Sequence, residues 1–348
     1  MKDWLTSWGG SEQQLLDLLE LYPQAPVYTS VYDRARLPMF AKYDIRTMAV
    51  PKWLSTGRRF EWLAPLLPAY FNRLRLNADV VVSVTSGFAK AAHAVSPGQH
   101  ISVFNTPLRF AWNFGGDDRG RLGKLLAPWF RRFDVRSSRA VDLYLANSHN
   151  VAQRVKECYG RESEVVYPPV HCAEYLAVQR AAKPAGWLVV ARLVSYKRTD
   201  LVVEAANQLG IPLTVIGDGP EATRLQALAG PSVRFLGFTD QKVILDEMSW
   251  AAAFIFPSNE DFGITPVEAM AAGLPVIAFG QGGATETVVD GETGLFFAEQ
   301  TASSLISAWN LFQKKTWSAD RCRQRAAEFS KEKFLTSLQR YIKQAHQR

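Results

Sequence analysis

The chain has 348 residues, of which 47% are hydrophobic and 21% are charged. This composition is typical of a folded protein and excludes a disordered one, and the length suits two domains that each bury a core. The formal net charge of +7 lies in residues 1–150, which hold 19 Lys and Arg against 12 Asp and Glu. Such a basic half favours an anionic partner: a phospholipid surface, a lipid-pyrophosphate carrier or nucleic acid.

Signals for targeting and for metal binding are few. No apolar run approaches the ~20 residues of a membrane span, and residues 1–10 do not have the pattern of a signal peptide. The three cysteines, Cys158, Cys172 and Cys322, are odd in number and share no spacing typical of metal ligands. The sequence therefore predicts a reduced, cytoplasmic protein, and its basic half leaves open a position at the inner face of the membrane.

Gly9 and Gly10 are the first feature in chain order, and a helical pattern with four leucines follows them. Two glycines before a helix N-terminus let the backbone approach a phosphate closely. A plain helix start explains the same residues, and the sequence leaves both explanations open.

Residues 27–32 and 45–50 read as strands. In residues 53–76, aromatic and apolar side chains are interleaved with Arg58, Arg59, Arg73 and Arg75. One explanation is a core helix whose arginines reach the solvent, and the other is an amphipathic surface that touches a membrane.

Residues 79–84 and 101–104 are the next predicted strands, and the second leads directly into Asn105. Residues 114–123 are rich in glycine and charge, which predicts a mobile loop. The following segment, 125–142, places aromatic residues beside four arginines and predicts a helix with an exposed basic edge.

A proline pair, Pro168 and Pro169, marks the predicted boundary between a first domain, 1–168, and a second domain, 169–330. In the second domain, buried strands centred on residues 189, 215, 235, 254 and 276 alternate with helices. This alternation predicts a parallel, doubly wound α/β sheet.

Two cations follow the first of these strands. The buried run Trp187–Ala191 leads to Arg192 and then Lys197, just ahead of a helix. The planar fork of an arginine can grip a diphosphate while a lysine adds a mobile point charge, so the pair suits a pyrophosphate. Each cation alone would as often be a solvated surface charge.

Two glutamates follow the strand predicted at residues 250–256. Glu260 lies in a loop at the carboxyl end of that strand, where open α/β sheets bind ligands. Thr265 and Glu268 have the spacing of a capping box with Pro266 at the first helical position, and this box by itself explains Glu268. The predicted helix also points unpaired N–H groups at the same crevice, which favours an anion. A ligand with both phosphates and hydroxyls would suit all these groups.

Gly217 follows a third strand end, in the segment V-I-G-D-G-P from Val215 to Pro220. The segment matches a dinucleotide fingerprint only in part, because Pro220 and Arg224 break the spacing Gly-x-Gly-x-x-Gly. The sequence therefore disfavours a nicotinamide enzyme.

Three segments together resemble the retaining glycosyltransferases of family 4: R-L-V-S-Y-K from Arg192, V-I-G-D-G-P from Val215, and E-D-F-G-I-T-P-V-E-A from Glu260. The resemblance implies the GT-B fold, in which two Rossmann-like domains face a cleft, with residues 331–348 as a helix that crosses back to the first domain. It also implies sugar transfer from a nucleotide diphosphate donor without a metal or another cofactor. The loop Phe279–Val288 is similar to that of the branch that includes bacterial surface-polysaccharide mannosyltransferases.

By position, the resemblance assigns Arg192 and Lys197 to the diphosphate, Glu260 to the hydroxyls of the donor hexose and Glu268 to the ribose. Its remaining donor-binding positions are Gly10, Gly217, Gly263, Ile264 and Thr265.

The chain departs from the family in two places. Only Met1–Thr6 precede the Gly9–Gly10 loop, where relatives have a hydrophobic first strand, so the first strand of the N-terminal domain is predicted to be missing. Asn105 stands where relatives carry a histidine near the donor sugar. It remains a candidate catalytic residue that exchanges hydrogen bonds, but it cannot carry a proton at neutral pH.

Together with the resemblance, these observations predict a retaining hexosyltransferase. Its expected donor is a nucleotide sugar, with GDP-mannose preferred, and its expected acceptor is a lipid-linked sugar or a polysaccharide such as that of lipopolysaccharide. The alternative is a non-catalytic, degenerate subunit that binds nucleotide sugars. A nucleic-acid binder would explain the basic half but not Glu260 and Glu268.

Overall fold

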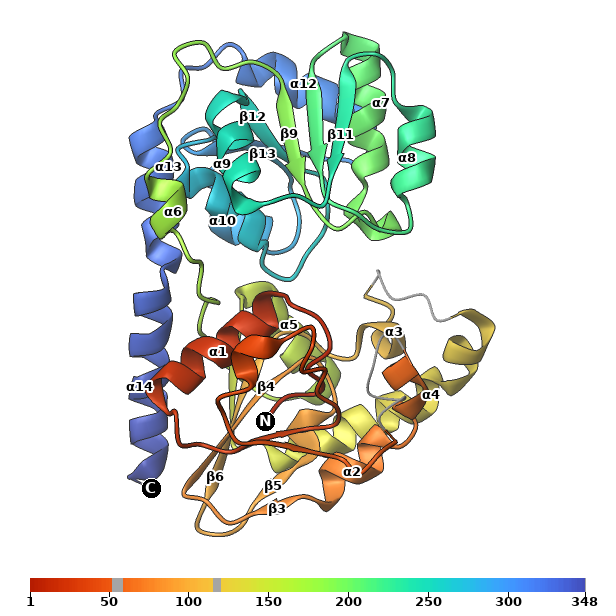
Figure 1. The fold of residues 1–348 in the computed structure, drawn as a ribbon, viewed down its shortest axis with the longest axis vertical. Coiled ribbons are helices and arrows are strands. Elements are labelled where there is room, and N and C mark those ends of the chain that lie inside the picture. Colours follow the sequence, from red (N-terminus) through yellow and green to blue (C-terminus); the bar gives the residue numbers. More distant parts are fainter. Residues whose placement is uncertain (52–58, 115–119, 348) are drawn as a thin grey trace. The chain divides into compact units, whose positions relative to one another are not determined.

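The computed structural model describes residues 1–51, 59–114 and 120–347. It has two compact units, each built on parallel β-sheets (Figure 1). Unit 1 comprises Met1–Pro169 and Lys331–Arg348, and unit 2 comprises Val170–Ser330. Among the described residues, no helix combines the length and the apolar character needed to cross a lipid bilayer.

Unit 2 contains a six-stranded parallel sheet in the order β11-β10-β9-β12-β13-β14. Counted from one to six along the chain, this is the order 3-2-1-4-5-6 of a doubly wound nucleotide-binding sheet, which confirms the predicted fold class. The strand order reverses between β9 and β12, so a ligand crevice is expected at the carboxyl ends of these two strands. The strands are β9 (Trp187–Val190), β10 (Leu213–Ile216), β11 (Val233–Gly237), β12 (Ala253–Phe256), β13 (Val276–Phe279) and β14 (Gly294–Phe297).

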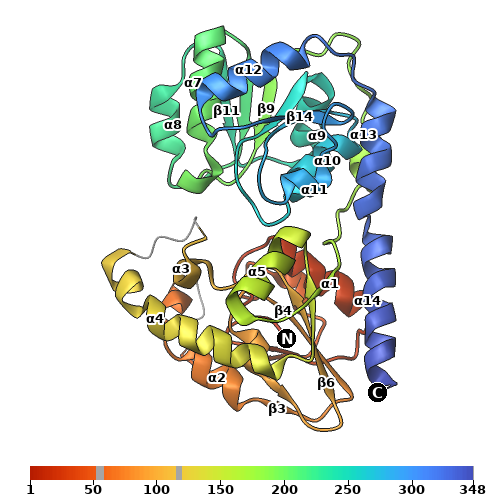
Figure 2. The same cartoon turned by 180° about the vertical axis from the view of Figure 1, so that it is seen from behind.

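Helices cover both faces of this sheet (Figure 2). They are α6 (Ala173–Leu176), α7 (Thr199–Leu209), α8 (Ala222–Leu228), α9 (Gln241–Trp250), α10 (Ile264–Ala271), α11 (Ala284–Thr287), α12 (Ala302–Phe312) and α13 (Ala319–Ala326). The inner strands β9, β12 and β13 are apolar and largely buried, because helices cover them on both sides, whereas the edge strand β11 is partly exposed and carries Arg234. At one face, Trp187 of β9 packs edge-on against Trp309 of α12 with ring centroids 5.4 Å apart. The strand predicted from residue 250 begins only at Ala253, because α9 continues to Trp250.

Unit 1 has a four-stranded parallel sheet in the order β4-β6-β7-β8 and two pairs of short parallel strands, β1 with β2 and β3 with β5. Its strands are β1 (Val27–Thr29), β2 (Ile45–Thr47), β3 (Arg75–Leu76), β4 (Val80–Thr85), β5 (His93–Ala94), β6 (Gln99–Phe104), β7 (Leu143–Ala146) and β8 (Glu164–Val165). Its helices are α1 (Gly10–Leu21), α2 (Leu67–Arg73), α3 (Arg109–Trp112), α4 (Gly120–Ser137), α5 (His149–Tyr159) and α14 (Lys331–His346). The last helix, α14, belongs to unit 1 and packs with α1 on its core.

The residues before α1 form no regular strand. Lys2 forms an isolated parallel bridge with Val84 of β4, and Leu5 forms one with Tyr32, just beyond β1. Met1–Leu5 therefore occupies the position between β4 and β1, but only at the carboxyl end of these strands.

Two expectations about unit 1 were wrong. Gly120–Gly123 belong to α4 rather than to a loop, because the helix begins at Gly120, and residues 115–119 lie outside the described residues. The aromatic and arginine-rich stretch 53–76 is not one helix: a 3-10 turn at Arg59–Leu63, α2 and β3 follow one another. The structure does not describe residues 52–58, which include Arg58.

Candidate active site

The carboxyl ends of β9 and β12 bring two distant motifs together in unit 2. Lys197 lies in a 3-10 turn after β9, and Glu260 lies in the loop after β12. The Lys197 Nζ is 2.5 Å from the Glu260 Oε1, and the Ser258 hydroxyl donates to the same oxygen at 2.7 Å. Both side chains of the ion pair are largely buried, at 15% and 17% exposed. The pair thus lies at the point where the strand order reverses.

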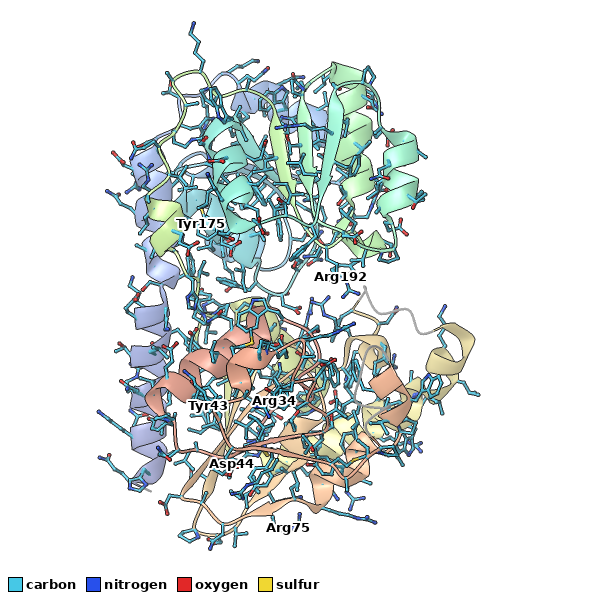
Figure 3. All side chains as sticks on the ribbon, in the orientation of Figure 1. Arg34, Tyr43, Asp44, Arg75, Tyr175 and Arg192 are labelled. Atoms are coloured by element: carbon cyan, nitrogen blue, oxygen red, sulfur yellow. The ribbon has the colours of Figure 1, made fainter. Side chains whose placement is uncertain are left out.

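Arg192 lies two residues beyond the end of β9 and is exposed (Figure 3). Its guanidinium makes no hydrogen bond or ion pair with any residue that the structure describes. The five donors of this fork are therefore available to an anion at the strand end.

Gly217, at the end of β10, shapes the same strand end through its size. A Cβ at this position would lie 1.9 Å from the Ala191 carbonyl oxygen, so only glycine fits here, and its φ is +133°. The Gly217 N–H donates to the Gly237 carbonyl at 2.8 Å. That N–H is thus engaged within the sheet, and the residue supports the backbone next to Arg192.

The helix after Glu260 begins two residues earlier than the predicted capping box implies. Gly263, with φ +91°, is the N-cap of α10, and Ile264 is the first helical residue. The predicted capping box is therefore wrong: Thr265 and Pro266 lie inside the helix, because the left-handed turn at Gly263 starts it sooner. Within the described part of the chain, no side chain caps this end. The N–H groups of its first turn and the positive end of its dipole suit an anion.

Glu268 lies on α10, one turn after Thr265. It is partly buried, and burial raises the pKa of its carboxyl to about 7, although the Tyr175 hydroxyl of α6 donates a hydrogen bond to it. The electrostatic interaction with His171 also acts to lower the pKa of Glu268. Near neutral pH the carboxyl is consequently divided between its two protonation states.

Unit 1 carries the other two predicted site residues, Gly10 and Asn105. Gly10 is the exposed first residue of α1, with Gly9 as its N-cap. A carboxylate of the chain itself is close to this helix end: Glu12, in the first turn, forms an ion pair with Lys2 at 3.1 Å. The anion site predicted at Gly10 thus lies beside the Glu12 carboxylate, whose negative charge is balanced by the ion pair with Lys2.

Asn105 directly follows β6. Its backbone N–H donates to the Thr85 carbonyl at 3.0 Å, and its Oδ1 accepts from the Asn147 Nδ2 at 3.4 Å. The Asn105 Nδ2 is buried and has no hydrogen-bond partner among the described residues. A buried donor of this kind costs free energy unless a ligand or a water accepts a hydrogen bond from it.

The sequence analysis missed a buried polar network that holds the loop regions after β4 and β6. Lys90 and Asp134 are fully buried and form an ion pair, and the Lys90 Nζ also donates to the Gly87 carbonyl at 2.6 Å. The Trp112 indole and the Tyr159 hydroxyl each donate to the Asp134 Oδ2 at 2.7 Å. Asp134 belongs to no recognisable sequence motif, because it is a single acidic residue among arginines.

Asp3 was also missed, because a single acid near the start of the chain belongs to no motif. Its buried carboxylate accepts hydrogen bonds from the Thr85 hydroxyl and from the backbone N–H groups of Ser86, Phe88 and Ala89 at 2.7–2.9 Å. It thereby fixes the loop after β4 to the start of the chain.

A third missed residue is Phe238, which follows β11 and is 91% exposed. Phe238 and Arg192 both follow the carboxyl ends of strands. Their strands, β11 and β9, are two positions apart in the sheet, so these strand ends are about 10 Å apart. An exposed aromatic ring at this edge offers a face on which a planar group can stack. Within the part of the chain that the structure describes, no group of three or more His, Cys, Asp or Glu side chains could hold a metal ion.

Two family models match the chain, one in each half. Residues 8–174 match the model described as "Glycosyltransferase Family 4", and residues 177–329 match the model described as "Glycosyl transferases group 1". Together they support a glycosyltransferase of the family 4 type.

Individual proteins are similar to parts of the chain or to its fold. A glycogen synthase of Mycobacterium tuberculosis is 29% identical over 49% of this chain and 45% of its own length. A GDP-mannose-dependent alpha-mannosyltransferase of Mycolicibacterium smegmatis is 28% identical over 60% of this chain and 56% of its own length. The alignments thus span about half of these relatives. The crystal structure of HepE from Anabaena with UDP and glucose superposes with a TM-score of 0.70 and 18% identity, covering 98% of both chains, which shows that the fold is shared.

Proposed function

We propose that this chain, a GT-B glycosyltransferase of the family 4 type, moves a hexose from a nucleotide diphosphate sugar to a lipid-linked or polysaccharide acceptor with retention of configuration. One observation carries the proposal. Arg192, Lys197 and Glu260 gather where the strand order of the unit 2 sheet reverses, the position at which such sheets bind nucleotides.

The diphosphate is the leaving group of the proposed reaction, and its developing charge needs stabilisation. Arg192 can contact two phosphate oxygens at once, and the uncapped N-terminus of α10 at Gly263, Ile264 and Thr265 offers backbone donors. Lys197 adds a cation whose position Glu260 fixes. Fixed positive groups of this kind lower the barrier without a metal ion, which is the metal-independent mechanism that we propose.

The two glutamates would bind hydroxyl groups of the donor. Glu260 accepts from Lys197 and Ser258, and we assign its carboxylate to the hexose hydroxyls, which would donate to it. Glu268 is assigned to the ribose, whose hydroxyls would donate to the ionised carboxylate. Gly10 is assigned to the donor phosphates through the N-terminus of α1.

Asn105 would contact the donor hexose or the acceptor through its unpartnered Nδ2. Since a side-chain amide cannot take up a proton at neutral pH, Asn105 cannot act as a base. In the proposed retaining reaction the departing phosphate therefore takes the proton of the acceptor hydroxyl, on the same face of the sugar.

GDP-mannose is the donor that we propose. The name of the M. smegmatis relative supports mannose, while that of the M. tuberculosis relative supports a glucosyl donor. Phe238 would stack on the nucleobase, because its exposed ring follows β11, whose carboxyl end lies about 10 Å from that of β9.

An acceptor linked to lipid would bring the protein to a membrane surface. In α4, Leu125 and Trp129 are 75% and 49% exposed beside the exposed Arg132 and Arg136. Apolar and cationic side chains on one helix suit an anionic membrane, which would place the protein at the inner face of the membrane.

The function is tested by incubating the purified protein with GDP-, UDP- and ADP-hexoses without added metal, and measuring both donor binding and release of free nucleotide. We expect GDP release from GDP-mannose, accelerated by a lipid-linked acceptor. Binding without release in the presence of acceptors would favour the non-catalytic subunit, and Asn105→His would then be expected to create activity. If no nucleotide sugar binds, the proposal fails.

A further inference from the structure

The carboxyl ends of β6 and β7 in unit 1 hold two asparagines side by side. Asn105 directly follows β6, and Asn147 directly follows β7. The two strands are parallel, with Phe104 level with Ala146, so the asparagines are the next pair in the same register. The Asn147 N–H donates to the Phe104 carbonyl at 3.2 Å, which continues the ladder. The two side chains therefore lie on one face of the sheet, at the strand spacing of about 4.8 Å.

A serine hydroxyl sets the direction of the hydrogen bonds between these asparagines. Ser148 is the N-cap of α5, and its Oγ accepts from the Val151 N–H at 3.1 Å. Its own proton goes to the Asn147 Oδ1 at 3.2 Å. Because the Asn147 oxygen faces Ser148, its Nδ2 faces the Asn105 Oδ1 and donates to it at 3.4 Å. The donors of this chain thus all point from the start of α5 toward Asn105.

This direction determines how the Asn105 amide is turned. If the amide were rotated by half a turn, its NH₂ would face the NH₂ of Asn147, and two donors cannot bond to each other. The Asn105 Nδ2 therefore points away from Asn147. It is buried and has no hydrogen-bond partner among the residues that the structure describes. An oxygen that accepts a hydrogen bond would satisfy this group.

We propose that Asn147 is a positioning residue, which orients the Asn105 amide so that it donates a hydrogen bond to an oxygen of a bound sugar and does not accept one. The inference rests on the proposed function, which assigns Asn105 to the donor hexose or the acceptor, and it adds the direction of that contact. Burial supports a fixed orientation, because Asn147 is only 6% exposed and Ser148 is fully buried. A hydroxyl or ether oxygen of a hexose fits this site, whereas a group that can only donate does not.

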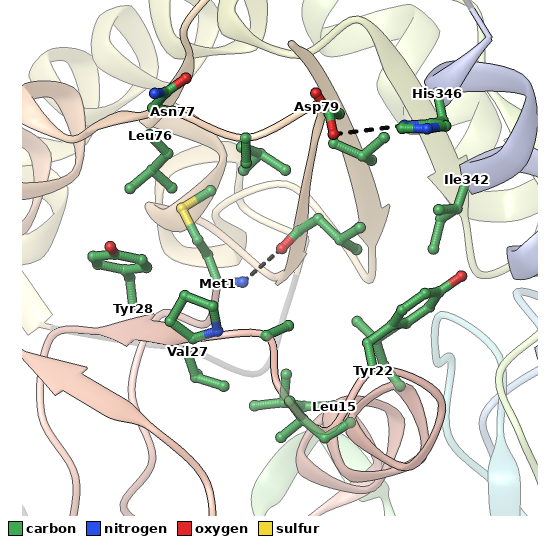
Figure 4. A pocket seen from close by; sticks show the side chains of 18 of the residues that line it. Met1, Leu15, Tyr22, Val27, Tyr28, Leu76, Asn77, Asp79, Ile342 and His346 are labelled. Atoms are coloured by element: carbon green, nitrogen blue, oxygen red, sulfur yellow. Dashed lines mark hydrogen bonds and ion pairs between the residues drawn. The ribbon is translucent and has the colours of Figure 1, made fainter.

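A cavity at the other end of the unit 1 sheet has a different character. It has a volume of about 860 Å³ and lies between the amino ends of β4 and β1 (Figure 4). Its walls are mainly aliphatic, with leucines from α1 and valines from β4. Such walls do not replace the hydrogen bonds of a hydrated sugar. Asn77, an exposed residue at this cavity, therefore provides a control remote from Asn105.

The experiment introduces Asn147→Asp into the unmodified chain and into a chain with Asn105→Ala. The new carboxylate keeps the bond from Ser148 but cannot donate to Asn105, so the Asn105 amide should turn its oxygen toward the sugar. We expect kcat/KM for nucleotide release from GDP-mannose to fall by about 10- to 100-fold. In the Asn105→Ala chain, the same substitution should change kcat/KM by less than about 2-fold, because the amide that it orients is absent. Asn77→Asp should leave kcat/KM unchanged.

A spectroscopic measurement tests the orientation without turnover. In ¹⁵N NMR spectra of the free protein, a side-chain NH₂ proton of Asn105 should move downfield with Asn147→Asp, because it would then bond to a carboxylate. This test remains decisive if no nucleotide sugar is turned over, an outcome that would refute the proposed function alone. If Asn147→Asp does not fold, Asn147→Leu has a similar volume and should show the same dependence of kcat/KM on Asn105.

Two results would overturn the proposal. Equal losses of kcat/KM with and without Asn105→Ala would mean that Asn147 does not act through Asn105. An Asn105 signal that stays in place or moves upfield would mean that Asn147 does not set the orientation of this amide.

Discussion

Unit 2 and unit 1 use the same kind of parallel sheet in different ways. In unit 2 the sheet is continuous from β11 to β14, and strand ends carry the charged residues of the proposed donor site. In unit 1 the strands are divided into a four-stranded sheet and separate pairs, and a groove lies between β4 and β1. In unit 2, the order of the strands is enough to bring the charged side chains together. In unit 1, whose strands do not form one continuous sheet, buried hydrogen bonds of Asp3 and the buried Lys90–Asp134 ion pair hold the loops after the strands in place.

The largest effect is expected from Arg192→Ala, which tests whether unit 2 carries the donor chemistry. Loss of a positioned cation should lower kcat/KM by about 10²–10³, since this group would stabilise the leaving diphosphate. The midpoint of thermal unfolding should stay the same, because the guanidinium is exposed. Nucleotide release from GDP-mannose measures the loss.

Arg224→Ala is the matched control, because this arginine is an exposed residue of α8 that pairs with Glu221. Its activity should equal that of the unmodified chain. An equal loss of kcat/KM in both variants would mean that Arg192 does not contact the donor diphosphate.

The second prediction concerns the buried ion pair between Lys90 and Asp134 in unit 1. Lys90→Met would leave the buried Asp134 carboxylate without its cation, which should cost about 3–5 kcal/mol of the free energy of unfolding. Denaturant unfolding measures the change. Lys156→Met is the control, since Lys156 and Glu162 are exposed and their ion pair should contribute less than about 1 kcal/mol.

A Lys90→Met protein that does not fold would still allow the test. Adding Asp134→Asn removes the unpaired charge and should recover part of the stability. If Lys90→Met is as stable as the unmodified chain, the buried pair does not hold unit 1 together.

Phe238→Ala should have a smaller effect, confined to nucleotide binding. Loss of one stacking face should weaken the binding of the nucleotide about 10-fold, in line with the ~1–3 kcal/mol that such stacking contributes. Titration calorimetry gives the affinities. Leu228→Ala, which alters another exposed side chain of unit 2, should leave the affinity as it is, and a similar loss there would argue against a base at Phe238.

The smallest effect is a pH dependence from Glu268. Ribose hydroxyls would donate to the ionised carboxylate, and the pKa of this group is about 7, so the affinity for GDP-mannose should rise a few-fold between pH 6 and pH 8. Glu268→Gln should abolish this rise. A rise that persists in Glu268→Gln would assign the titration to another group.

The same pKa has the opposite effect on the stability of the free protein. Because the folded-state pKa lies above the usual value of 4.5, the contribution of Glu268 is fully present below that value and is lost as the pH rises through about 7. Bound nucleotide sugar should reduce this loss.

The sequence predicted the doubly wound sheet of unit 2, because apolar runs of strand length alternate with helical segments there. It also placed Arg192, Lys197 and Glu260 after strands, although the contact between Lys197 and Glu260 depends on the strand order and could not be derived from spacing. The start of α10 was misplaced because a left-handed glycine outweighed a capping box. Asp3, Asp134 and Phe238 escaped notice, since burial and exposure of single residues leave no periodic signal.

The path of the chain through the two units has a consequence for synthesis. Unit 2 is one uninterrupted stretch, Val170–Ser330, whereas unit 1 needs Lys331–His346 from the far end of the chain. During translation, which proceeds from the N-terminus, unit 2 can therefore complete its core before α14 leaves the ribosome. Unit 1, although made first, would finish folding last.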